Sequence, residues 1–161
     1  MSAGSTTGLT LDTGALLALD RPAKTVVMQA RLEAARRRGG TICIPAEAVA
    51  QAWRSPRQVR LARLLKSPDI DIAVMTLSVA RSVGLMCADA NHDDVVDVHV
   101  VLCARQRHHA IVTSDPRGIA RIDPTVPRIL VSLRVPKTRA TWAKAGFGTH
   151  TRCCSTLDCP G

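Results

Sequence analysis

The chain has 161 residues, of which 46% are hydrophobic and 2% aromatic, and it carries a formal net charge of +9. This length supports one domain with a substantial core, and the near absence of aromatic side chains argues against binding nucleic acid by base stacking. The excess of Lys and Arg favours a polyanionic partner such as nucleic acid, although a solvated Arg-rich surface would give the same charge.

Short apolar runs alternate with helical patterns along most of the chain. Residues 1–8 are small and polar and predict a disordered leader. Apolar runs predict strands at 9–12, 41–44, 69–74, 110–113 and 128–133. Between them, helical spacing predicts helices at 13–19, 23–38, 46–53, 56–66, 78–86, 93–107 and 116–121. We therefore expect an α/β fold over residues 9–135, with a parallel sheet and helices on both of its faces.

Two of the predicted helices have an apolar face that should pack on the sheet. In the helix at 23–38 this face consists of Val26, Val27, Ala30 and Ala34. In the helix at 93–107 it consists of Val96, Val100, Val101 and Ala104. Beyond Val135 the chain becomes small, polar and basic without periodicity, so we expect the tail of 136–161 to be mostly disordered.

The cysteines do not form an evident disulfide framework. Cys43, Cys87 and Cys103 each lie alone in an apolar stretch, where Cys behaves as a small hydrophobe. The tail cysteines cluster near a single His, but their spacing matches no usual zinc pattern. The sequence shows neither a signal peptide nor an apolar run of the roughly 20 residues needed to span a membrane. We expect a cytoplasmic protein with reduced thiols that does not bind a membrane.

Acidic residues stand at the ends of several predicted elements. Asp12 and Asp115 each follow a strand, Glu47 begins the helix after the second strand, and Asp97 lies on the helix at 93–107. Taken singly, an Asp at a helix start can be a cap, and Glu47 can complement a helix dipole. If the first and fourth strands are neighbours, however, these carboxylates converge at the carboxyl edge of the sheet. Converging carboxylates need a cation, and hard oxygen ligands select Mg²⁺ or Mn²⁺.

Four blocks together resemble the PIN domain, and in particular its VapC toxin branch. They are Asp12-Thr13 after the first strand, Pro45-Ala46-Glu47, the run from Asp94 to Ala104, and the run from Ile111 to Pro116. The resemblance covers residues 8–133 and implies a three-layer α/β/α fold with a catalytic acid set of Asp12, Glu47, Asp97 and Asp115. It implies metal binding by Asp12, Asp97 and Asp115, with Asp94 as a further ligand, and it makes Thr13 and Thr113 hydroxyls that orient carboxylates and water.

This resemblance implies an Mg²⁺- or Mn²⁺-dependent endoribonuclease that hydrolyses RNA with a metal-activated water. Such a protein would be the toxin of a toxin–antitoxin pair, a homodimer held in check by a cognate antitoxin. Three arginines after the Glu47 helix are candidates to bind RNA phosphates, although they could also be solvated surface: Arg54, Arg57 and Arg60. An antitoxin groove could be formed by exposed Leu16, Leu17 and Val26.

Other functions remain open. A PIN-fold RNA-binding module without turnover is the main alternative, and the intact acid set argues against it. A DNA flap nuclease is disfavoured because the chain lacks large insertions. His99 stands two positions after Asp97 and should point to another side of the helix, so we do not assign it a catalytic role. His108 and His109 lie near a helix end, where we expect them at the surface.

Overall fold

The computed structural model describes residues 8–131, so residues 1–7 of the predicted leader, the whole of the predicted tail at 136–161 and its three cysteines lie outside the described residues. The sheet has five strands in the order β3-β2-β1-β4-β5, and every neighbouring pair is parallel. The strands are β1 Leu9–Leu11, β2 Ile42–Pro45, β3 Ile70–Ala73, β4 Ala110–Thr113 and β5 Arg128–Leu130. The predicted neighbourhood of the first and fourth strands is confirmed by the register of β1 on β4.

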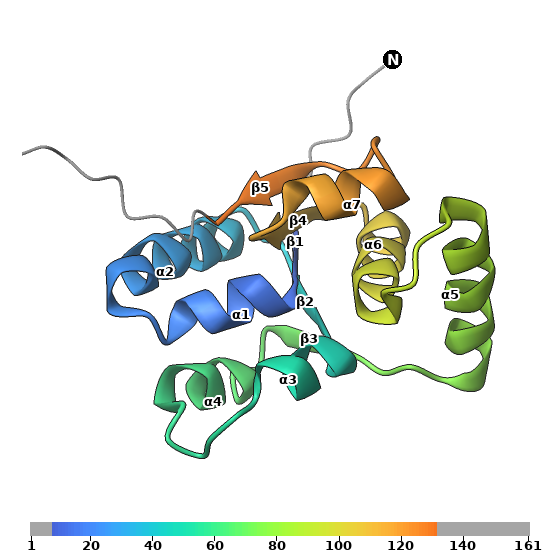
Figure 1. Ribbon diagram of the computed structural model, residues 1–161. Coiled ribbons are helices and arrows are strands. Elements are labelled where there is room, and N and C mark those ends of the chain that lie inside the picture. Colours follow the sequence, from blue (N-terminus) through green and yellow to red (C-terminus); the bar gives the residue numbers. More distant parts are fainter. Residues whose placement is uncertain (1–7, 132–161) are drawn as a thin grey trace, which may run out of the picture.

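Helices cover both faces of the sheet (Figure 1). One face carries α1 Thr13–Leu19, α2 Pro22–Arg37, α3 Ala46–Ala52 and α4 Val59–Leu65. The other face carries α5 Leu77–Ala90, α6 Val95–Arg107 and α7 Pro116–Ile122. The predicted three-layer α/β/α architecture is therefore confirmed. Within residues 8–131, no helix is both long enough and apolar enough to cross a membrane.

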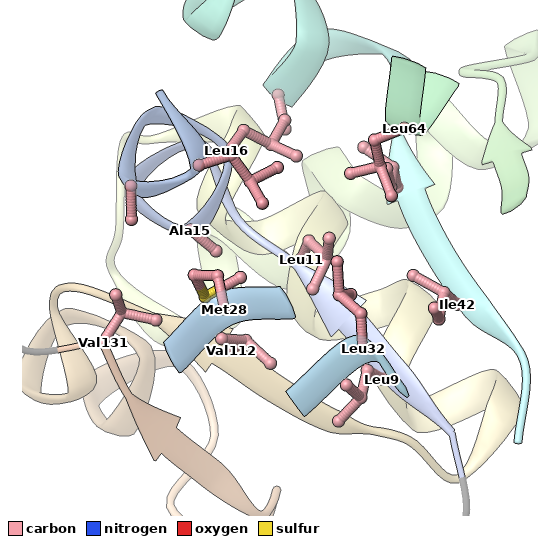
Figure 2. Close-up of a cluster of buried hydrophobic side chains, with 14 of the residues drawn as sticks. Leu9, Leu11, Ala15, Leu16, Met28, Leu32, Ile42, Leu64, Val112 and Val131 are labelled. Carbon is pink, nitrogen blue, oxygen red and sulfur yellow. The ribbon is translucent and has the colours of Figure 1, made fainter. Parts of the chain in front are cut away.

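Strand residues alternate between two cores, one on each side of the sheet. Figure 2 shows the larger core, where side chains of the strands meet those of α1, α2 and α4. The second core joins Ile111 of β4 to buried residues of α5, α6 and α7. Because both faces of the sheet are covered by helices, polar functional side chains are expected at the ends of the strands, outside the two cores.

The buried face of α2 differs from the predicted one. Val26 is 72% exposed and Val27 is 50% exposed, so the prediction that they pack on the sheet is wrong. The buried residues of α2 are Lys24, Thr25, Met28, Leu32 and Ala35. Both sets have helical spacing, and the rotation of α2 is decided by its neighbours: the Thr25 hydroxyl donates to the Leu19 carbonyl of α1 at 2.7 Å, and Met28 and Leu32 enter the larger core.

His109 is also placed differently, because it is buried and only 4% exposed. His108, which is exposed as predicted, adopts a left-handed conformation with a φ of 54° and ends α6. After this turn the His109 ring lies beside β1 and the start of β2. It contacts the Thr10 hydroxyl at 3.2 Å and the Thr41 hydroxyl at 3.0 Å. A ring that sits between two hydroxyls is satisfied in the interior, so the expectation of a surface residue is wrong.

Candidate metal centre

Three of the predicted acids are helix caps at the carboxyl edge of the sheet. Asp12 caps α1, Asp94 caps α6 and Asp115 caps α7, and each uses its Oδ1 to accept backbone N–H groups of the helix that it begins. Capping was the simpler explanation for Asp12 and Asp115, and it is confirmed. A carboxylate has several lone pairs, however, so an Asp that caps a helix can still bind a metal ion with its remaining lone pairs.

Asp12 and Thr113 join the ends of β1 and β4. Asp12 is 6% exposed, and burial raises the pKa of its carboxyl, while hydrogen bonds from the Thr113 hydroxyl and from nearby backbone N–H groups lower it. The Thr113 hydroxyl also accepts from the Asp115 backbone N–H at 2.8 Å. Thr113 therefore lies between two of the predicted acids, Asp12 and Asp115.

Asp97 has the most strongly perturbed carboxyl of the group. Burial raises its pKa to about 6, and the negative charges of Asp94, Asp12 and Asp115 add to this effect. The structure thus brings Asp12, Asp94 and Asp115 close enough for their charges to act on Asp97. The strand-end argument placed Asp12, Asp97 and Asp115 together with Glu47, whereas Asp94 is implied by the resemblance to the PIN domain. A cation bound among these carboxylates would relieve the repulsion, so the cluster is a candidate metal site.

His92 is a neighbour that the sequence did not single out for this site. Its Nε2 lies 3.8 Å from Asp97 Oδ2, and its charge counters the rise in the pKa of Asp97. This Nε2 is buried without a hydrogen-bond partner among the described residues. In the sequence, the one indication that His92 could lie near the acids is its position two residues before Asp94, the N-cap of α6.

Glu47 is bound by a side chain of α6. Its Oε2 lies 2.8 Å from Nδ1 of His99. His99 does point to another side of α6 from Asp97, as expected, but it points inward and is 1% exposed. Hydrogen bonds to Cys103 and to Glu47 raise the pKa of His99 against the opposing effect of burial. The contact between Glu47 and His99 was missed because α3 and α6 meet only in the folded chain.

Thr13 and Arg54 make local contacts. The Thr13 hydroxyl donates to Gln51 Oε1 at 2.8 Å and so ties α1 to α3 rather than binding a carboxylate. The Arg54 guanidinium donates to the Ala50 carbonyl at 3.1 Å, at the end of α3. This contact gives Arg54 a structural role as well as the predicted one on RNA.

Arg57 and Arg60 line a hollow of about 590 Å³ beside α4, together with Arg63. Arg60 and Arg63 also line a neighbouring hollow of about 210 Å³, whose apolar wall is Leu19, Leu32 and Leu64. Arg63 was not predicted, although its spacing of three residues from Arg60 on one helix was a usable signal. Leu16, which was expected in an exposed groove, is fully buried, whereas Val26 is exposed.

The donor set fits Mg²⁺ or Mn²⁺ in its chemistry. All four aspartates offer hard oxygen ligands, and their mutual repulsion favours a divalent cation. Among residues 8–131, no three His, Cys, Asp or Glu side chains gather closely enough to bind one ion together. Mg²⁺ keeps several waters and takes one or two carboxylates plus phosphate oxygens, so it does not require three side chains around one point.

Comparison with known proteins shows a likeness in fold. No family model matches the sequence, and no curated protein matches it. The fold is similar to the solved structure of FitAB bound to an IR36 DNA fragment, with a TM-score of 0.55 and 17% identity over 76% of this chain and 94% of that chain. At this identity the likeness concerns the arrangement of elements alone, and it identifies the five-stranded parallel sheet with its two helical layers as a PIN-like fold.

Proposed function

We propose that the protein is a metal-dependent endoribonuclease and the toxin of a toxin–antitoxin pair. The observation that carries this proposal is the convergence of four aspartates at the carboxyl edge of the sheet, which contributes to raising the pKa of Asp97 to about 6. In a chain with a net charge of +9, an acidic cluster of this kind is best explained by a cation that also binds a phosphate backbone.

In this proposal Asp12, Asp97 and Asp115, with Asp94 as a further candidate, are the ligands, of which one or two would bind the ion directly and the others through its waters. A bound Mg²⁺ or Mn²⁺ would activate water for attack on a phosphodiester and neutralise charge at the phosphate. Thr113 keeps the Asp12 carboxylate in place through its hydrogen bond. Glu47, whose carboxylate is held by His99, is proposed as a further carboxylate of the site.

The proposal is tested by RNA cleavage with Mg²⁺ or Mn²⁺. Asp12→Asn is the most informative variant because Asn keeps the cap of α1 while it loses the charge. We expect cleavage by the wild type, none with EDTA, and a loss on the order of 1000-fold in Asp12→Asn. Asp89→Asn makes the same change at an exposed position of α5 and should cleave like the wild type. Equal cleavage by Asp12→Asn, or cleavage in EDTA, would sink the mechanism.

RNA is proposed to run over the basic hollow beside α4. Replacing Arg60 and Arg63 together by Ala should weaken RNA binding in EDTA by about tenfold at low salt and lower the salt slope by about 1 per Arg. Arg121→Ala, an exposed change on α7, is the control on the opposite face of the sheet. Fluorescence anisotropy across a salt series measures both quantities. An unchanged slope in the double variant would place the RNA elsewhere.

The partner is proposed to be an antitoxin protein. FitAB, which shares the fold, was solved bound to DNA. In this chain the hollow of about 210 Å³ between α2 and α4 combines an apolar wall with Arg36, Arg60 and Arg63. Such a hollow suits a partner segment that carries apolar and acidic side chains together. The homodimer that the resemblance implies belongs to the same proposal.

A catalytically silent RNA-binding module is the second candidate. It is favoured by one observation, which is that no three ligating side chains of the described residues lie around a common point. The two candidates differ in the cleavage experiment: the module would bind RNA through its arginines but would leave it intact with either metal.

A further inference from the structure

A polar stripe runs along one buried side of α6. His99, Cys103 and Arg107 recur every four residues and therefore share one side of the helix. His99 is 1% exposed and Cys103 is 2% exposed. A helix that packs on a parallel sheet normally turns apolar side chains inward, so three chemically active side chains in this position are unusual.

The stripe lies against β2 and β3. Cys43 of β2 is fully buried and packs with Cys103 and Ala73 in a small cluster separate from the two main cores. Alternation along β2 explains this placement, because Ile42 and Ile44 point to the core of α1–α4. The side chains of Cys43 and Cys103 thus pack together, and each thiol is the strongest electrostatic influence on the other.

Contacts along the stripe connect the candidate site to the edge of the sheet. At one end His99 Nδ1 meets Glu47 Oε2 at 2.8 Å, and the ring of His99 also bonds Cys103. At the other end Arg107 Nη2 lies 2.7 Å from Asp71 Oδ2 on the edge strand β3. The order of contacts is therefore Glu47, His99, Cys103 and Cys43, with the Arg107–Asp71 pair beside the thiols.

The two thiols have different chemical characters. The hydrogen bond from Cys43 lowers the pKa of Cys103 against burial, and His99 and Arg107 lower it further. The same contact raises the pKa of the Cys43 thiol, which burial raises as well. Because Cys103 lies one helical turn from His99 and one turn from Arg107, whose charges favour a thiolate, we assign it as the nucleophile and Cys43 as the thiol that reacts second.

We propose that Cys103 and Cys43 form an oxidation-sensitive modification site whose reagent is a hydroperoxide. The Cys103 thiolate attacks a peroxide oxygen, the O–O bond breaks, hydroxide leaves, and Cys103 becomes a sulfenic acid. The Cys43 sulfur then displaces the oxygen of this sulfenic acid. A disulfide forms, and the Cys43 proton leaves with that oxygen as water. In total two thiols are oxidised, and one hydrogen peroxide is reduced to two waters.

Both thiols are buried, Cys43 fully and Cys103 with 2% exposed, so the proposal requires a local opening that admits a small oxidant. The charged neighbours of the thiols at this edge of the sheet are Arg107 and Asp71, whose side chains are 30% and 51% exposed. An exposed ion pair of this kind contributes little to stability, and the proposed path of the peroxide passes it.

Disulfide formation would alter the candidate site through His99. Once its sulfur is bonded to Cys43, Cys103 no longer supplies the thiolate that holds the His99 ring, and His99 in turn positions Glu47. This consequence rests on the proposed nuclease function, whereas the disulfide itself does not. The Glu47 carboxylate should lose its fixed orientation in the oxidised protein.

The chemistry is tested by treating the full chain with hydrogen peroxide, alkylating the remaining thiols in denaturant and mapping the peptides by mass spectrometry. We expect a linked Cys43–Cys103 peptide that dithiothreitol removes, and Cys87 of α5 recovered in alkylated form. Cys103→Ser should abolish the link, and the matched Cys87→Ser should leave it unchanged. The proposal would be overturned if Cys43 and Cys103 were both recovered in alkylated form at peroxide doses that oxidise Cys87. It would also be overturned by a sulfinic acid on Cys103 without a Cys43–Cys103 disulfide.

The link to function has its own measurement. Oxidised wild type should cleave RNA at least about tenfold more slowly than reduced wild type, with recovery in dithiothreitol, and Cys43→Ser should lose this response. A disulfide without any change in cleavage overturns the role of His99. If the reduced wild type does not cleave RNA at all, the proposed function fails, and the peptide map still decides the modification site.

Discussion

Asp97→Asn is expected to stabilise the metal-free protein while it abolishes RNA cleavage. Burial and the neighbouring acids raise the pKa of Asp97 from 3.8 to about 6, so the charged carboxylate opposes folding at neutral pH. Its side chain is 31% exposed, and after discounting for solvent screening we expect a gain of about 1–2 kcal/mol at pH 7. Cleavage should fall at least about 100-fold. The negative charge of Asp97 is repelled by its neighbours in the metal-free protein, but the same charge attracts the metal ion that cleavage requires.

The pH dependence of this gain has a defined sign. A raised folded-state pKa means that the native protein binds the Asp97 proton more tightly than the unfolded chain does. Wild-type stability should therefore fall, relative to Asp97→Asn, as the pH rises through the window from 3.8 to about 6. Below this window the two proteins should be equally stable, and above it the full difference should be present.

Urea unfolding in EDTA at several pH values measures this difference. Asp93→Asn is the matched control, since it removes a charge from an exposed residue just before α6 that is not among the main causes of the raised pKa of Asp97. A variant Asp97→Asn that is less stable than the wild type at pH 7 would show that the carboxylate is stabilised by the fold. The convergence of the four aspartates would then be the wrong description of the site.

Gly14→Ala should cost about 1–3 kcal/mol of stability, because α1 begins directly against the end of β4. A Cβ at Gly14 would lie 1.9 Å from Ser114 Oγ, 2.7 Å from Ser114 Cβ and 3.3 Å from its backbone N. Rotating the Ser114 hydroxyl relieves only the first of these contacts. The strand and the helix must therefore separate, and this separation would also pull Asp12 away from Asp115.

Gly84→Ala is the matched control for this change. Nothing lies within 4 Å of a Cβ at Gly84, which is exposed within α5. Ala is the better helix former, so the control should be more stable than the wild type by about 0.5–1 kcal/mol. Urea unfolding of the two variants compares them directly, and a Gly14→Ala protein as stable as the wild type would contradict the close approach of α1 to β4.

Features that depend on neighbours along the chain were predictable. The alternation of strands and helices, the fold class and the caps at Asp12 and Asp115 follow from residues a few positions apart. Element boundaries were less certain. The helix expected from residue 56 begins at Val59, because the Gln58 side chain accepts from the Arg54 and Ser55 backbone N–H groups and closes a turn there.

The choice between two equally periodic faces was not predictable. Val26 and Val27 have the spacing of a buried face, yet α2 turns Met28 and Leu32 inward. Periodicity shows that a helix has an apolar face, but when two faces are possible, the elements packed around the helix decide which one is buried. The burial of His109 has the same origin, since its hydroxyl partners at Thr10 and Thr41 lie on distant parts of the chain.

The sequence by itself determined that acids follow the first and fourth strands, because strand ends and helix caps are local features. Only the tertiary structure decided that His99 meets Glu47, 52 residues away, and that Cys103 meets Cys43. These contacts depend on the strand order and on α6 packing across β2, and no local pattern specifies either. The physical reason is that helical spacing states which side chains share a face of α6, whereas the partner of that face is selected by the packing of the whole sheet.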